Sequence, residues 1–226
     1  FFFQAEDGIR DTELWLEFRR VLFRSFDIDT IELIFFSSIP SIVPSELFDE
    51  KLGNKYLETN TSIKEDIQHE LTIDKKIAVV YSYDKLFINI LNKKKVKYSI
   101  KNYFTVLYNY LFQMDKISDG LSLYINLNED SFDILIFDSK EFIYFNSFDI
   151  KDKNEFLYYL FFVMKNYEIS NEKDKIIFLG RYDKYSEYYE IANKYSKLDY
   201  IHDDSGNQFN SKSPFFSYLN EDNFRK

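Results

Sequence analysis

Residues that could carry chemistry are few in this chain of 226 residues, which has two histidines and no cysteine. Without cysteine there is neither a disulfide framework nor a thiolate metal or redox site. His202, Asp203 and Asp204 are metal-ligand types, but neighbouring residues at a strand end point to opposite faces. The run Asp-Asp-Ser-Gly that contains the two aspartates is also ordinary turn chemistry. We therefore expect no metal site.

Groupings typical of catalysis are equally scarce. Nucleophilic catalysis by serine, histidine and aspartate would need a glycine-flanked elbow, and the sequence has none. General acid–base work would fall on carboxylates, and no pair of them stands out. His69 alternates onto the surface of a short predicted strand, where we expect it to be exposed. We predict a protein that is not an enzyme, has no catalytic residues and holds no cofactor.

The elements that would position a site are clearest between Leu121 and Glu168. Short apolar runs separated by polar turns predict a three-stranded meander: Leu121–Leu127, Phe132–Phe137 and Phe142–Phe148. Aliphatic residues occupy both faces of the middle run after Asp133, which is typical of a central strand. A helix is predicted to follow, because Asp152 can cap it and Glu155 is placed for a capping box.

A short internal sequence repeat indicates two similar halves. Lys76–Lys85 and Lys175–Lys184 both begin Lys-Ile and end Tyr-Asp-Lys, and each precedes a predicted helix and a short strand. Such repetition predicts a duplicated unit. Asn102 is the predicted cap of a helix that joins the halves. The first half also carries an insertion, residues 45–72, with a helix that Gly53 ends and two edge strands: Ser45–Leu52, Tyr56–Glu58 and Ile67–Thr72.

Residues 1–25 differ in composition from the rest. They hold four of the six arginines, none of the 23 lysines and the only tryptophan, Trp15. The string resembles the translated sequencing-adapter sequence found at the ends of metagenomic reads; the structural alternative is an amphipathic helix over Asp11–Phe23. We predict that this segment is non-native and that the natural chain begins upstream of Phe26. The predicted domains are 1–25, a truncated first half 26–116, a second half 117–207 and a tail 208–226.

Composition limits the classes of partner. The net charge of −9 and pI of about 4.9 argue against nucleic acid, because binding phosphate backbones needs a basic surface. No apolar run approaches the roughly 20 residues of a membrane span. We therefore expect no transmembrane segment and a cytoplasmic location. The aromatic residues of the tail either dock on the body or contact a partner or a membrane.

The order of predicted elements is that of a ribonuclease-H-like half: three antiparallel strands, then alternating helices and strands. Two such halves make the actin-like fold. Four segments also resemble a bacterial family, domain of unknown function 3822: Val43–Glu50, Phe132–Phe137, Phe145–Phe148 and Glu155–Leu160. The resemblance covers Ile31 to about Phe216. It implies an α/β fold, a duplicated ribonuclease-H-like (actin-like ATPase) fold distantly related to pilus-assembly ATPases, with the first half lacking its opening strands. It implies no known activity.

An actin-like ATPase holds phosphates on two hairpins rich in small residues, with an aspartate to organise the metal. The first hairpin would lie upstream of the present chain. The second is Asn126–Ser131, which has no glycine and two carboxylates that would repel a triphosphate. The adenosine loop offers Gly180 alone. One hypothesis is a non-catalytic actin-like scaffold that binds a protein partner and has a degenerate nucleotide site. The other is a nucleotide (ATP)-binding actin-like assembly protein whose first phosphate loop lies upstream.

Overall fold

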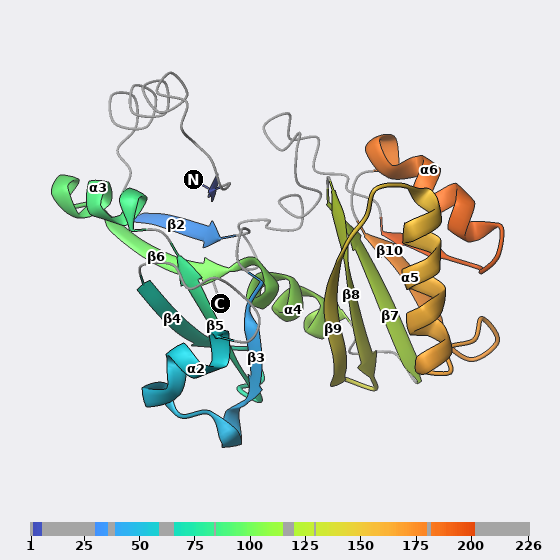
Figure 1. Ribbon diagram of the computed structural model, residues 1–226, viewed down its shortest axis with the longest axis horizontal. Coiled ribbons are helices and arrows are strands. Elements are labelled where there is room, and N and C mark those ends of the chain that lie inside the picture. Colours follow the sequence, from blue (N-terminus) through green and yellow to red (C-terminus); the bar gives the residue numbers. More distant parts are fainter. Residues whose placement is uncertain are drawn as a thin grey trace. The chain divides into compact units, whose positions relative to one another are not determined.

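The computed structural model describes residues 2–5, 30–35, 39–58, 66–83, 85–114, 120–128, 130–179 and 182–201. The chain divides into two compact units, Phe1–Asn109 and Tyr110–Lys226 (Figure 1). Each unit has its own sheets and core. The domain boundaries drawn from the sequence, and the non-native origin of residues 1–25, stay predictions.

The second unit contains one five-stranded sheet. In spatial order its strands are β11 (Asp199–Ile201), β10 (Lys175–Leu179), β7 (Leu121–Leu127), β8 (Ser131–Asp138) and β9 (Glu141–Asp149). The pairs β7–β8 and β8–β9 are antiparallel, whereas β10 is parallel to both β7 and β11. This arrangement confirms the predicted meander and the ribonuclease-H-like order of the second half.

Two helices, α5 (Lys153–Asn166) and α6 (Tyr182–Asn193), lie on the same side of this sheet (Figure 1). The core on that side consists mainly of alternate strand residues and one stripe of α5: Leu123, Ile125, Leu127, Phe132, Ile134, Ile136, Ile176, Phe178, Phe156, Leu160, Val163 and Met164. The period of two on the strands and the helical period on α5 bring these side chains to one layer.

The start of α5 confirms the predicted cap. The Asp152 carboxylate accepts hydrogen bonds from the backbone N–H groups of Asn154 at 2.7 Å and Glu155 at 3.0 Å. Glu155 accepts in return from the backbone N–H of Lys151 at 2.8 Å. These bonds satisfy donors that have no partner inside the helix, so the chain reverses sharply between β9 and α5.

Short turns set the register of the meander. Ser139 and Lys140 join β8 to β9 with φ angles of +48° and +75°, as a two-residue turn that follows the twist of the strands requires. Gly120 enters β7 at φ +91°, where a side chain would be strained.

The first unit contains two three-stranded sheets. One is parallel and consists of β1 (Phe2–Ala5), β2 (Thr30–Phe35) and β6 (Lys97–Asn102). The other is antiparallel and consists, in spatial order, of β3 (Ser41–Pro44), β5 (Ile77–Tyr83) and β4 (Asp66–Leu71). Helices α3 (Leu86–Lys94) and α4 (Tyr103–Met114) flank β6 in sequence, and the boundary between the units falls within α4. Asn102 caps α4 as predicted, since its side chain accepts from the Phe104 N–H at 2.9 Å.

The segment between β3 and β4 differs from its prediction. Ser45–Leu52 is two 3₁₀ turns, Ser45–Leu47 and Glu50–Leu52, because the Asp49 side chain accepts from the Lys51 N–H and starts a new turn. Gly53 is the C-cap of the second turn, but its right-handed φ and ψ let the chain continue directly into α2 (Gly53–Leu57). The predicted strand at Tyr56 is therefore wrong, whereas the predicted edge strand at Ile67 is confirmed as β4.

The predicted equivalence of the strands in the two similar segments, Lys76–Lys85 and Lys175–Lys184, is also wrong. β5 lies between two antiparallel neighbours, and β6 pairs with β2 rather than with β5. β10 lies between two parallel neighbours. The shared residues specify a strand followed by a helix in both places, but strand pairing depends on partners that are distant in sequence.

Candidate functional site

The turn between β7 and β8 corresponds to the second phosphate-binding hairpin of an actin-like ATPase, which the sequence predicts to be degenerate in this chain. Asp133 on β8 lies opposite Asn126 on β7 and is fully buried. Its Oδ2 atom accepts hydrogen bonds from the side-chain amides of both Asn126 and Asn128, each at 3.0 Å. A buried carboxylate is stable only when hydrogen bonds or charges compensate it, so this cluster ties the two ends of the turn together.

Backbone groups of the turn also form hydrogen bonds within the protein. The Asn128 N–H donates to the Ser131 carbonyl at 2.9 Å, and the Asp130 carbonyl accepts from the Ile150 N–H at 2.9 Å. The Asp130 side chain is exposed. A hairpin that cradles a phosphate instead directs several free N–H groups at the anion. In this chain the Asn128 N–H is used within the turn, and the carboxylate of Asp130 is exposed beside it.

Sequence reasoning missed Asp133 as a site residue, although a signal was present. An acid that interrupts an apolar run is unusual, and the hairpin register places it opposite an asparagine. The other predicted positions of a nucleotide or metal site, Glu129, Gly180 and His202–Asp204, lie outside the described residues, as does the tail 208–226.

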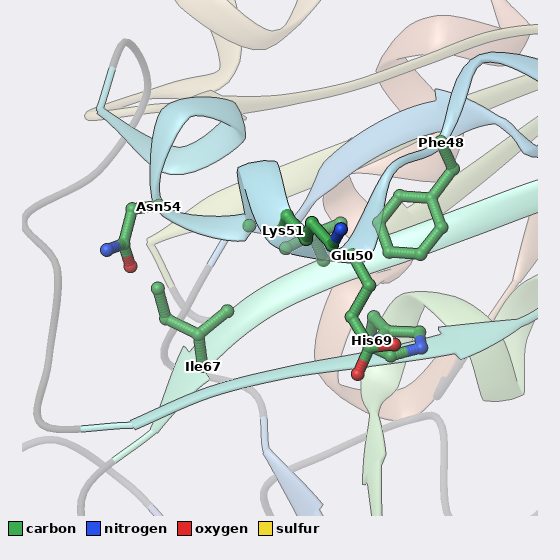
Figure 2. A pocket seen from close by; sticks show the side chains of 8 residues that line it. Phe48, Glu50, Lys51, Asn54, Ile67 and His69 are labelled. Atoms are coloured by element: carbon green, nitrogen blue, oxygen red, sulfur yellow. The ribbon is translucent and has the colours of Figure 1, made fainter.

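A small pocket lies on the antiparallel sheet of the first unit (Figure 2). Its volume is about 250 Å³, and its lining mixes apolar and polar side chains: Phe48, Glu50, Lys51, Gly53, Asn54, Ile67, His69 and Val80. The prediction that His69 is exposed is wrong, because the turns before α2 fold over β4. The His69 ring is half-buried and lies 4.9 Å from the ring of Phe48, centre to centre.

Glu70 follows His69 on β4 and therefore points to the opposite face of the sheet. One carboxylate oxygen accepts from the backbone N–H of Asn102, where β6 gives way to α4, at 2.7 Å. Burial raises the pKa of Glu70 to about 7, against smaller opposing effects that include the charge of Lys101. Burial also raises the pKa of the Tyr81 hydroxyl, with a further contribution from Glu70. Glu70 is thus an acid that changes charge near neutral pH at a junction between two elements.

Two further properties concern only the described part of the chain. It contains no group of three or more histidine, aspartate or glutamate side chains arranged to hold a metal ion. None of its helices combines the length and the apolar composition that crossing a membrane requires.

Two solved structures share the fold. A Bacteroides thetaiotaomicron protein with actin-like ATPase fold and unknown function has a TM-score of 0.75 and 19% identity, over 91% of this chain and 79% of that one. A structure of the PilM–PilN type IV pilus biogenesis complex has a TM-score of 0.58 and 9% identity, over 91% of this chain and 82% of that one. At these identities the likeness establishes an actin-like fold alone. No curated protein matches the chain.

The sequence itself matches one family. The profile described as "Protein of unknown function (DUF3822)" aligns with residues 14–198. The match covers more than half of the chain and includes elements of both units, from β2 to α6. The chain therefore belongs to the DUF3822 family, and its fold is that of the actin-like ATPases.

Proposed function

We propose that this protein is a non-catalytic member of the actin-like fold class that acts by binding another protein, and that its nucleotide site is degenerate. The β7–β8 hairpin carries the proposal. An actin-like ATPase needs free backbone N–H groups and small residues there, so that the phosphates can approach closely. In this chain Asp133 binds the Asn126 and Asn128 amides, and the Asn128 N–H closes the turn.

Electrostatics support the same proposal. The exposed carboxylate of Asp130 adjoins the turn, and the whole chain carries a net charge of −9. A triphosphate would approach this hairpin against a negative potential, which lowers both its association rate and its affinity. The PilM–PilN structure, in which one chain has a fold similar to that of this protein, is a complex of two proteins. We take from it, as an analogy of fold, only the class of activity proposed here.

Thermal unfolding of the full-length gene product with and without Mg-ATP tests the proposal. A ligand at 100 times its Kd stabilises the native state by about 2.7 kcal/mol, which raises the Tm of a domain of this size by about 5–10 °C. We expect no saturable shift with millimolar Mg-ATP beyond that caused by Mg²⁺ alone. A saturable shift of several degrees would contradict the proposal. Repeating the titration with Ser131→Lys would then show whether the nucleotide binds at this hairpin.

A further inference from the structure

Strand β4 forms one border of the antiparallel sheet in the first unit (Figure 1). Within the described part of the chain, β5 is the only strand that pairs with it. The Thr72 N–H donates to the Ile77 carbonyl at 3.0 Å, and bonded and non-bonded pairs alternate along an antiparallel ladder. The residues whose N–H and C=O groups point away from β5 are therefore Ile67, His69 and Leu71. These groups form no hydrogen bond to any described residue.

The border strand on the other side, β3, differs from β4 in one respect. The Ser45 N–H donates to the Lys76 carbonyl, so by the same alternation the outward residues of β3 are Ile42 and Pro44. Pro44 has no N–H to offer, and proline commonly protects an edge strand from further pairing. β4 contains neither proline nor lysine. Of the two border strands, β4 is thus the one suited to receive an added strand.

The small pocket of the first unit lies beside this edge. Its lining includes Ile67 and His69 of β4 and Val80 of β5, but no residue of β3. Figure 2 shows the Ile67 and His69 side chains on β4, below the segment that carries Phe48. The next side chain on the same face of β4, Leu71, is 47% exposed. A strand added to β4 would place every second side chain on this face, next to the pocket.

The size and the lining of the pocket suit one aromatic side chain. Its volume is about 250 Å³, and a cavity of roughly 150 Å³ is enough to hold a benzene molecule. Phe48, Ile67 and Val80 offer apolar contacts. The Phe48 and His69 rings lie 4.9 Å apart between centres and are tilted by 44°, so they present a face and an edge to a third ring.

The segment over the pocket, residues 45–58, carries an excess of acids. Its exposed charged side chains are four acids and two bases: Glu46, Asp49, Glu50, Glu58, Lys51 and Lys55. Glu50 lines the pocket itself. A basic segment is therefore attracted to this surface. A second copy of the chain, paired through its own β4, would bring its own excess of acids to the same face, which is unfavourable.

We propose that the β4 edge and the adjoining pocket bind an extended segment of a partner protein that carries one aromatic residue flanked by basic residues. The segment adds a strand to the sheet by hydrogen-bonding to the outward groups of Ile67, His69 and Leu71. Its aromatic side chain enters the pocket against Phe48, and its basic side chains meet the acids of residues 45–58. This inference specifies the site and the partner of the protein-binding function proposed above and rests on it.

A synthetic peptide tests the inference on the full chain. The probe is a fluorescein-labelled strand of about seven alternating threonine and valine residues, with phenylalanine replacing the central valine and two lysines at each end. We expect saturable binding by fluorescence anisotropy. Hydrogen exchange measured by NMR should slow at the His69 and Leu71 amides more than at the Gln68 and Glu70 amides, which point toward β5. Replacing the phenylalanine by alanine should weaken binding at least about tenfold, because a buried central anchor supplies a large share of the affinity.

Gly53→Met blocks the pocket from the protein side. Gly53 has helical backbone angles, and a Cβ atom there would lie 3.5 Å from Cγ2 of Ile67, an ordinary contact. The variant should therefore fold, which thermal unfolding checks, and should weaken binding at least about tenfold by filling the space of the peptide's ring. The matched control Gln68→Met puts the same side chain at an exposed position on the opposite face of β4. It should change the affinity by less than about twofold.

The charge arm uses Glu50→Lys, which should weaken binding of the lysine-flanked probe about fivefold at low salt and less at high salt. A glutamate-flanked peptide should bind more weakly than that probe. Absence of saturable binding, equal affinity for the phenylalanine and alanine peptides, equal affinity for the two flanks, or equal losses with Gly53→Met and Gln68→Met would overturn the inference. So would a stable dimer in sedimentation that Gly53→Met dissociates, because the occupant would then be a second copy. A saturable Mg-ATP shift contradicts the proposed function, whereas failure of the peptide arms without such a shift contradicts this inference alone.

Discussion

Glu70 makes the stability of the first unit depend on pH in a direction opposite to that of most acids. Its carboxyl is partly buried between β4 and the start of α4, and burial raises its pKa from 4.5 to about 7. The folded chain therefore keeps this proton at pH values where the unfolded chain has lost it. Raising the pH above 4.5 favours unfolding through this group, and the effect is complete above pH 7.

The size of the effect follows from the two pKa values. A change from 4.5 to about 7 corresponds to about 3 kcal/mol over the whole range. About 2 kcal/mol of this falls between pH 5.5 and pH 8.5, a range that avoids the low solubility expected near the pI. Glu70→Gln removes the titration but keeps an oxygen that can accept from the Asn102 N–H. The unfolding free energy of the variant relative to the natural chain should therefore rise by about 2 kcal/mol over that range.

Urea unfolding of both proteins, followed by circular dichroism at several pH values, measures this difference. Taking the difference between the two proteins cancels the titration of all other groups to first order. Glu58→Gln, the same change at an exposed position after α2, is the matched control, and the difference for Glu70→Gln should exceed that of the control. A difference for Glu70→Gln that stays within about 0.5 kcal/mol, or that falls as the pH rises, would refute the reasoning.

Two predictions concern the stability of the second unit. Phe156 is fully buried against Phe132 and Phe178, so Phe156→Ala should lower the unfolding free energy by about 3–5 kcal/mol in urea titrations; a loss no larger than that of Tyr158→Ala, which truncates an exposed ring of the same helix, would contradict the packing described here. Asp152→Ala removes the cap of α5 and should cost about 1 kcal/mol by the same measurement, whereas the conservative Asp152→Ser should recover most of it, and equal losses for both would argue against the cap.

The sequence predicted best where structure depends on nearby residues. The meander from Leu121 to Asp149, the Asp152 cap and the Asn102 cap were all predicted, because side-chain alternation, turns and caps act over a few residues. The short 3₁₀ turns after Pro44 were not. Their boundaries depend on single hydrogen bonds, such as the one from Lys51 to Asp49, that compete with a regular helix.

The candidate sites were harder to predict from the sequence. Most of them depend on contacts between residues that are distant in sequence. Glu70 and Asn102 lie on different sheets, and the burial that raises the carboxyl's pKa exists only in the folded chain. His69 could not be placed in a pocket without knowing that the segment around Phe48 folds over β4. Asp133 could have been predicted from the sequence, because it lies opposite Asn126 in a hairpin whose register follows from the turn.

By itself the sequence determined which segments are strands and helices in the second unit, and it indicated the fold class through the order of those segments. It also determined that the turn at Asn126–Ser131 is acidic and lacks glycine. Only the tertiary structure decided that β5 pairs antiparallel with β3 and β4, although its sequence resembles that of the parallel strand β10. The physical reason is that local propensity specifies a strand, whereas the direction and partner of that strand are set by the surfaces it meets in the folded chain.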